Sequence, residues 1–151
     1  MIDQENIEPE KICINAITDE LAKVRELVEM HIQEMGFSEE KQFSIKLVID
    51  EICSNIIKHS YTTVQKPEDD YLKICIEIQK EVNKLIVKIF DQGPPFNPVE
   101  YHSQELSEKI KHPHKGGLGI TLVKLLSDNL SYSRLDSDPQ SNLLEITFFK
   151  N

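Results

Sequence analysis

The chain has no long apolar segment, few cysteines and a shortage of positive charge. No apolar run approaches the ~20 residues that span a bilayer, and the acidic N-terminus lacks the basic start and apolar core of a signal peptide. These absences predict a cytoplasmic protein with no membrane partner. Lys and Arg number 17 against 26 Asp and Glu, giving a formal charge of −9. That balance predicts no nucleic-acid partner, because such binding depends on cations that neutralise phosphates.

The three cysteines, Cys13, Cys53 and Cys75, are odd in number and far apart. This spacing predicts neither a metal-binding pair nor a redox pair, and favours buried thiols in a reducing compartment. Cys53 falls inside a helical segment without a neighbouring base, so a nucleophilic role is not expected.

Apolar periodicity divides the chain into strands and helices. A length of 151 residues with 39% hydrophobic residues favours one domain, residues 1–151. Thr18 or Asp19 is expected to cap the first helix and Ser38 the second, while Gly36 ends the first. The predicted strands are 11–16, 72–79, 85–90, 130–135 and 143–149; the predicted helices are 17–36, 38–59 and 120–128, with a short one near 104–110. This order predicts an α+β two-layer sandwich with a mixed, mainly antiparallel sheet and three main helices on one face.

The helix over 38–59 carries an unusual set of polar residues. Glu51, Asn55 and His59 recur every fourth residue, so they form one stripe on a helix of 3.6 residues per turn. A neighbouring apolar stripe is made of Ile45, Ile49, Ile52 and Ile56. The helix can therefore bury one stripe and present an acid, an amide and a ring to a binding site. Taken alone, a solvated surface stripe is the simpler interpretation.

Two further motifs follow along the chain. Asp91 and Gly93 end a predicted strand, where a carboxylate can accept a hydrogen bond from an exocyclic amino group; a plain turn is the alternative. Four residues then precede the helix over 120–128, namely Gly116, Gly117, Leu118 and Gly119. Glycine-rich backbone N–H groups at a helix start can face an anion. A flexible helix start is the alternative, and no Gly-Lys-Ser/Thr phosphate loop is present.

In this order, the three motifs resemble the Bergerat-type ATP-binding fold of gyrase B, the Hsp90 chaperones, sensor histidine kinases and the mismatch-repair ATPase MutL. The helix resembles that superfamily's N box, residues 88–98 its first glycine box and residues 114–123 its second. Within the superfamily, the chain is most similar to anti-sigma-factor serine/threonine kinases. That similarity rests on Asn-x-x-x-His-x-Tyr at 55–61 and Asp-x-Gly-Pro-Pro-Phe-x-Pro at 91–98.

The resemblance implies ATP and Mg²⁺ as cofactors and gives each motif a part in binding them. Asn55 would hold Mg²⁺ against the nucleotide phosphates. Asp91 would bind the adenine amino group, Gly93 would let the base approach closely, and Thr147 in the final strand would help to bind adenine, directly or through water.

The remaining residues would take part in the transfer step and in covering the phosphates. Glu51 would act as general base or orient the hydroxyl of the acceptor in phosphoryl transfer. Gly116, Gly117, Leu118 and Gly119 would form a lid over the phosphates and supply backbone amides.

The resemblance further implies an ATP-dependent serine/threonine protein kinase and anti-sigma-type regulator, which phosphorylates a small antagonist protein in a partner-switching pathway. It would also bind a sigma factor or another regulator, and form a homodimer through residues 11–35. A non-catalytic ATP-gated binding module, an ATPase domain detached from a sensor histidine kinase and a nucleotide-free structural protein remain as alternatives. A sensor kinase would need a phosphorylated histidine on a dimerisation helix, and His31 lacks the usual acidic residue directly after it.

Overall fold

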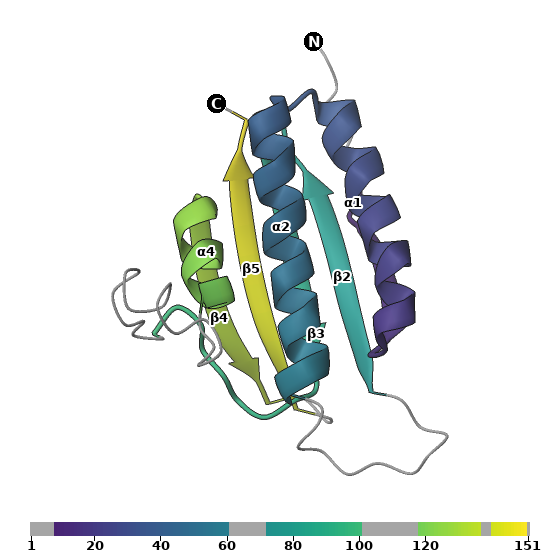
Figure 1. The fold of residues 1–151 in the computed structure, drawn as a ribbon, viewed down its shortest axis with the longest axis vertical. Helices are drawn as coiled ribbons and strands as arrows, with labels where there is room; N and C mark the ends of the chain where they lie inside the picture. The colour runs from purple at the N-terminus through teal and green to yellow at the C-terminus, as the bar shows by residue number, and fades with distance from the viewer. Residues whose placement is uncertain (1–7, 61–71, 101–117, 137–139, 151) are drawn as a thin grey trace.

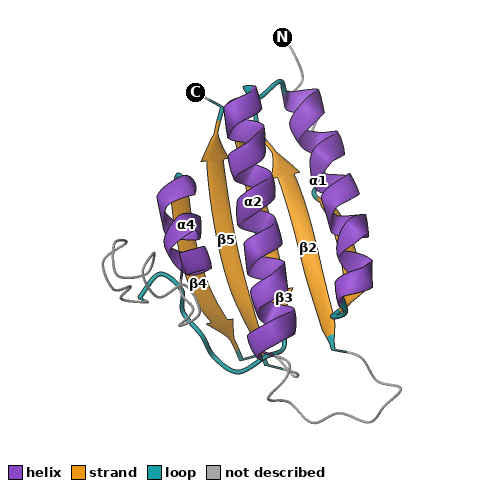
Figure 2. Ribbon diagram, in the orientation of Figure 1, coloured by secondary structure: helices purple, strands orange, loops and turns teal. Residues whose placement is uncertain are grey.

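Five strands and three α-helices form two layers in the computed structural model, which describes residues 8–60, 72–100, 118–136 and 140–150. Figures 1 and 2 show the helices lying over one face of a single sheet. The strand order is β1-β2-β3-β5-β4, and each of the four pairings is antiparallel. The predicted α+β two-layer sandwich is therefore confirmed. The strands are β1 (Glu10–Asn15), β2 (Lys73–Lys80), β3 (Lys84–Asp91), β4 (Asn129–Leu135) and β5 (Ser141–Phe149); the helices are α1 (Leu21–Met35), α2 (Glu39–Asn55) and α4 (Leu118–Leu126).

Alternating side chains divide the sheet into a core face and an open face. In β2, Ile74, Ile76 and Ile78 are buried beneath the helices, as the period of two predicts. Leu85, Val87 and Ile89 of β3 continue the same face, as do Leu144, Ile146 and Phe148 of β5. A residue's parity in its strand therefore decides whether it can reach a site between helices and sheet.

The first helix begins later than predicted. A 3-10 turn covers Thr18–Glu20, and α1 follows with Glu20 at its N-cap and no side-chain cap hydrogen bond. The expected cap by Thr18 or Asp19 is therefore wrong, because both residues lie within the 3-10 turn. The other end is as predicted: Gly36 closes the helix with φ 73°, a left-handed conformation that suits glycine.

Helix α2 is positioned by its cap and its apolar stripe. Ser38 is the N-cap, and its hydroxyl oxygen accepts from the Lys41 N–H (3.2 Å). Ile45, Ile49 and Ile52 are buried against the sheet, which confirms the predicted apolar stripe. After Asn55 the helix continues as a π-helical turn over Ile56–Ser60. The wider turn changes the rotation per residue at the end of the predicted polar stripe.

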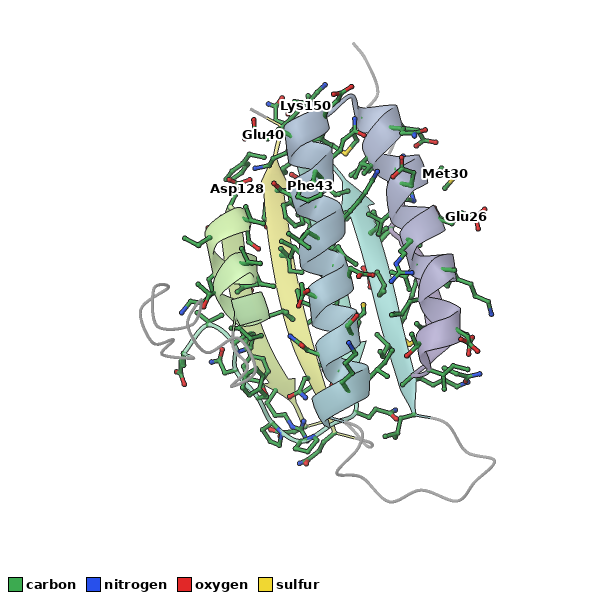
Figure 3. The ribbon with its side chains drawn as sticks, in the orientation of Figure 1. Glu26, Met30, Glu40, Phe43, Asp128 and Lys150 are labelled. Atoms are coloured by element: carbon green, nitrogen blue, oxygen red, sulfur yellow. A yellow bond between two sulfur atoms is a disulfide. The ribbon has the colours of Figure 1, made fainter. Side chains whose placement is uncertain are left out.

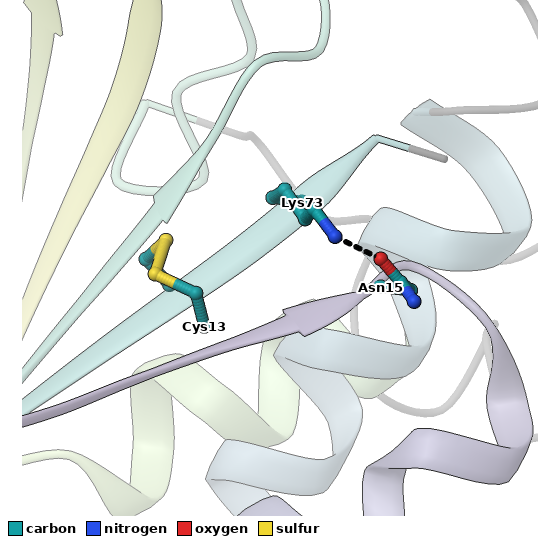
Figure 4. Close-up of a disulfide and its surroundings, with 4 residues drawn as sticks. Cys13, Asn15 and Lys73 are labelled. Atoms are coloured by element: carbon teal, nitrogen blue, oxygen red, sulfur yellow. Dashed lines mark hydrogen bonds between the residues drawn. A yellow bond between two sulfur atoms is a disulfide. The ribbon is translucent and has the colours of Figure 1, made fainter. Parts of the chain in front are cut away.

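A disulfide joins Cys13 to Cys75, so the expectation of three unpaired thiols is wrong. The two residues are 62 apart in sequence, but antiparallel pairing of β1 with β2 places them directly opposite one another, with Cα atoms 4.0 Å apart. Figure 4 shows the bond beside the hydrogen bond from Lys73 to Asn15. Both cysteines project from the open face of the sheet, where Cys13 is exposed. Cys53 is the free, buried cysteine.

Each helix of the layer carries an exposed apolar side chain, and Leu125 on α4 is 66% exposed. Met30 on α1 is 45% exposed and Phe43 on α2 is 67% exposed (Figure 3). Isolated exposed apolar residues are common on proteins and need no partner to explain them. Among the described residues, no helix combines the length and the apolar character that crossing a membrane would require.

Candidate functional site

A pocket lies where α2, α4 and the ends of β3, β4 and β5 converge. Its lining is mostly apolar with a few polar side chains, an arrangement that suits a flat base carrying hydrogen-bonding groups. Asn55, Asp91 and Asn142 provide the polar groups, together with Tyr132. The apolar lining consists of Ile52, Ile56, Phe96, Pro98, Ile120 and Leu144. Two of the predicted site residues, Asn55 and Asp91, thus line one pocket although 36 positions separate them in sequence.

Glu51, Asn55 and Gly119 lie against one another where α2 packs on α4. A methyl group placed on Gly119 would come within 2.3 Å of Glu51 Oε2 and 3.6 Å of Asn55 Nδ2. The absence of a side chain at Gly119 therefore leaves room for the Glu51 carboxylate beside the start of α4. The contact brings the predicted carboxylate and amide to the N-terminal end of a helix, where the helix dipole favours negative charge.

Asp91 is the last residue of β3 and points toward the helix layer. It is 8% exposed, and burial raises the pKa of its carboxyl group above the ordinary value. Hydrogen bonds from Asn142 and from the Gly93 N–H oppose that rise, as does the charge of Arg134. Gly93 N donates to Asp91 Oδ1 at 2.9 Å, so Gly93 holds the carboxylate through its own backbone.

Asn142 and Tyr132 line the pocket with Asp91, and Arg134 is bonded to Asn142. The sequence interpretation missed all three. Asn142 is paired with Asp91 across β3 and β5 and with Arg134 across β5 and β4. Its Nδ2 donates to Asp91 Oδ1 at 3.0 Å, and its Oδ1 accepts from Tyr132 Oη at 2.5 Å and Arg134 Nη1 at 3.1 Å.

A signal for Asn142 was present in the sequence. The predicted strand begins at Leu143, so Asn142 falls just outside it. Extending the apolar alternation of Ile146 and Leu144 backward by one step predicts that position 142 faces the core. A polar residue in that register is typical of a site rather than of a core.

The structure does not bring Thr147 to the pocket. Thr147 lies opposite Ile86 on β3, five residues along β5 from Asn142, a distance of about 17 Å along a strand. The separation is an odd number of residues, so Thr147 also faces away from the helices. The expected contact of Thr147 with the base site is corrected accordingly, and Asn142 occupies the position opposite Asp91.

Several predicted features lie outside the described residues. They include Gly116, Gly117, the loop around them and the short helix near 104–110, as well as the side chains of Leu118 and His59. Leu118 is the first residue of α4.

Cys53 is fully buried, and burial raises the pKa of its thiol to about 12. A thiol that stays protonated is a poor nucleophile, which agrees with the expectation that Cys53 has no nucleophilic role.

A second and larger cavity of about 320 Å³ lies between α1 and α2. Its lining is mainly apolar, and Arg25 pairs there with Asp50 at 2.7 Å. It contains none of the predicted nucleotide-binding residues, so the smaller pocket at Asp91 is the candidate functional site. His31 of α1 is 5% exposed, and its Nε2 lies 2.6 Å from Glu10 Oε2, so this histidine is not presented at the surface.

Comparisons with known proteins agree with this geometry. Residues 14–148 match the family model described as a histidine kinase-like ATPase domain. Over 100 residues the chain is 28% identical to the serine-protein kinase RsbW of Bacillus cereus (strain AH820) and of Bacillus anthracis, and 27% identical to that of Bacillus mycoides (strain KBAB4). Each alignment covers 64% of this chain and 59% of the relative.

The family match covers most of the chain and includes every element that forms the pocket. The protein therefore belongs to the histidine kinase-like ATPase domain family, whose members use ATP. The chain spans less than two thirds of the length of the serine-protein kinases to which it is similar.

Proposed function

We propose that this protein is an ATP-dependent serine/threonine protein kinase and an anti-sigma-type regulator, which phosphorylates a small antagonist protein in a partner-switching pathway. The observation that carries the proposal is the contact of Glu51 and Asn55 with Gly119, beside a pocket closed by Asp91. The carboxylate of Glu51, proposed as the catalytic group, lies next to groups suited to a nucleotide. The similarity to serine-protein kinases supports the same reaction.

Asp91 and Asn55 would bind the two ends of the nucleotide. The carboxylate of Asp91 accepts hydrogen bonds only, so it suits the exocyclic amino group of adenine. Asn55, one turn along α2 from Glu51, would hold Mg²⁺ through its carbonyl oxygen. The apolar walls would contact the faces of the base and exclude water from it.

The residues of the pocket fit a magnesium ion that is bound together with phosphates. Among the described residues, no three His, Cys, Asp or Glu side chains converge as a protein-only metal site. Mg²⁺ binds through one or two protein oxygen ligands, with water and phosphate oxygens completing its shell. Asn55 offers one such protein oxygen through its side-chain carbonyl. When bound, the ion neutralises phosphate charge and fixes the phosphates relative to one another.

Glu51 would orient the acceptor hydroxyl or accept its proton. Phosphoryl transfer depends mainly on positioning and electrostatic stabilisation, so one well-placed carboxylate is sufficient for the protein's share of the proton transfer. The stretch Gly116–Gly119 would cover the phosphates with backbone N–H groups. Residues 1–151 would act as a single ATP-binding kinase domain.

The partners proposed are proteins rather than nucleic acids or membranes. A formal charge of −9 supports the first exclusion, since phosphate backbones attract cationic surfaces. The acceptor would be a small anti-sigma antagonist, and a sigma factor would bind in the alternative complex. We further propose a cytoplasmic homodimer formed through residues 11–35.

The test measures binding and transfer separately. Purified protein is titrated with Mg-ATP in a calorimeter, then incubated with labelled ATP and with candidate antagonist proteins encoded near it. Wild type should bind ATP and label a serine or threonine of one antagonist. Glu51→Ala should keep ATP affinity within about threefold and lose at least about a hundredfold in labelling, as expected for a group used only in the transfer step.

Glu40→Ala is the matched control, because it makes the same change on the exposed first turn of the same helix. It should leave both measurements unchanged. No binding of Mg-ATP up to millimolar concentration would refute the proposed function. Binding without labelling of any antagonist would favour the ATP-gated binding module, and equal labelling by wild type and Glu51→Ala would refute the role of Glu51.

A further inference from the structure

Chemistry fixes the orientation of the Asn142 amide. Asp91 can only accept hydrogen bonds when ionised, and Arg134 can only donate them. Asn142 contacts both, so its Nδ2 must face Asp91 (3.0 Å) and its Oδ1 must face Arg134 (3.1 Å). The Tyr132 hydroxyl donates to the same Oδ1 at 2.5 Å. Two donors on one side and a carboxylate on the other leave the amide a single satisfied orientation.

The amide is further restrained by the turn that follows β3. Its Nδ2 also donates to the carbonyl oxygens of Gly93 (3.3 Å) and Pro94 (3.0 Å). Arg134 Nη1 donates to the same Gly93 oxygen at 2.8 Å. Asn142, 5% exposed, therefore ties three strands and the turn after Asp91 into one hydrogen-bonded unit. Because each polar atom of the Asn142 amide is bonded, the amide is held in place.

The two oxygens of the Asp91 carboxylate differ in their hydrogen-bond partners. Oδ1 accepts from Asn142 Nδ2 and from the Gly93 N–H. No described donor is bonded to Oδ2, and Asp91 lines the pocket. Rotation of the carboxylate would break both bonds to Oδ1. One acceptor oxygen is thus held in place for a ligand, while the other belongs to the protein.

We propose that Asn142 is a positioning residue that sets the selectivity of the site for adenine over guanine. Anchored by Tyr132 and Arg134, Asn142 holds the Asp91 carboxylate so that one of its oxygens meets the amino group of adenine. The same oxygen repels the oxygen that guanine carries in that position. The inference rests on the proposed function, because it requires an adenine nucleotide in this pocket. A site built around a fixed acceptor rejects a base that offers another acceptor, since both groups would be left buried without a donor.

The experiment compares the dissociation constants of ADP and GDP, each with Mg²⁺, by competition against a fluorescent ADP analogue. Asn142→Leu removes the amide at similar volume. Its ADP affinity should fall about 10- to 100-fold, the value of a hydrogen bond to a charged group. Its GDP affinity should change less than about twofold, so the ratio between the two bases collapses. Asn142→Ser, which keeps a donor and an acceptor, should recover part of that ratio.

The variant Asn142→Asp adds a readout that a merely structural role would not move. Two carboxylates opposite one another cannot both ionise without repulsion, and they share a proton as the pH falls. The titratable groups that face them from the described elements are Arg134 and Tyr132 of β4 and Cys53 of α2. ADP affinity of this variant should therefore increase from pH 8 to pH 6, because a protonated Asp at 142 donates to Asp91 as the amide does. Wild-type affinity should not increase over that range.

The matched control is Asn129→Leu, the same change at an exposed position on the far end of β4. It should leave both affinities at wild-type values. If Asn142→Leu lowers ADP and GDP affinity equally, so that the wild-type ratio of the two affinities is kept, the inference is overturned. If that variant does not fold, the ADP-to-GDP ratio of Asn142→Ser and the pH dependence of Asn142→Asp test the inference instead. If wild type binds no ADP, the proposed function fails as well, whereas ADP binding with an unchanged ratio in the variants overturns only the role of Asn142.

Discussion

Removing the Cys13–Cys75 disulfide should destabilise the fold by about 4 kcal/mol. The bond closes a loop of 62 residues, and the chain-entropy relation for a loop of that length gives about 4 kcal/mol at room temperature. Little packing is lost in a change to serine, because Cys13 is exposed and Cys75 is only half-buried on the open face of the sheet. For a chain of this size, the loss corresponds to a fall in Tm of roughly 10 °C.

The assay follows urea unfolding by circular dichroism for wild type and for the double variant Cys13→Ser/Cys75→Ser, with and without a dithiol reductant. Reductant should shift the wild-type midpoint to that of the double variant and leave the double variant unchanged. Titration of free thiols in denatured, non-reduced wild type should find the single thiol of Cys53. Finding all three thiols free would show that the bond does not form. One free thiol with equal midpoints would refute the loop-closure reasoning.

Three other changes test the site and the helix that carries it. Gly119→Ala should alter the free energy of unfolding by less than about 1 kcal/mol, because the clashing atom is the mobile end of the Glu51 side chain. The same change should lower phosphoryl transfer at least tenfold, because it displaces the Glu51 carboxylate. Thermal melts measure the first effect and labelling with ATP measures the second. Wild-type ADP affinity should fall as the pH drops through the raised pKa of Asp91, because only the ionised carboxylate accepts from the base; Asp91→Asn should bind weakly with no such dependence in calorimetry. Ser38→Ala should cost about 1 kcal/mol in urea unfolding and leave ADP affinity unchanged, since it removes only the cap of α2; a larger change in affinity than in stability would contradict that reading.

Local patterns predicted most of the secondary structure, while the exceptions arose at ends of elements. The isoleucine stripe of α2 and the alternation of β2 are properties of neighbouring residues, so their period identified each element and its buried side. The start of α1 is not marked by its sequence, because Thr18 and Asp19 have the composition of a cap in either a 3-10 turn or an α-helix. The apolar alternation marks β5 only from Leu143, because its polar first residues, Ser141 and Asn142, resemble the turn before them.

Several residues of the candidate site could be identified from local sequence patterns, but their contacts with one another could not. Glu51 and Asn55 could be recognised as a pair because one helical turn separates them, and Asp91 because it ends an apolar strand. Their meeting with Gly119 depends on how α2 packs against α4, which no local spacing specifies.

Strand register is what the sequence alone did not determine. Adjacent side chains in a strand point to opposite faces, so an odd offset between Thr147 and Asn142 separates a residue on the open face from one in the pocket. The same pairing of distant strands joins Cys13 to Cys75 across 62 residues. The sequence by itself determined the elements, the polar stripe on α2 and the carboxylate at the end of β3, because these follow from interactions between near neighbours. Only the tertiary structure decided which residue lies opposite Asp91 and which cysteines pair, because those contacts exist only after distant segments have paired in one register.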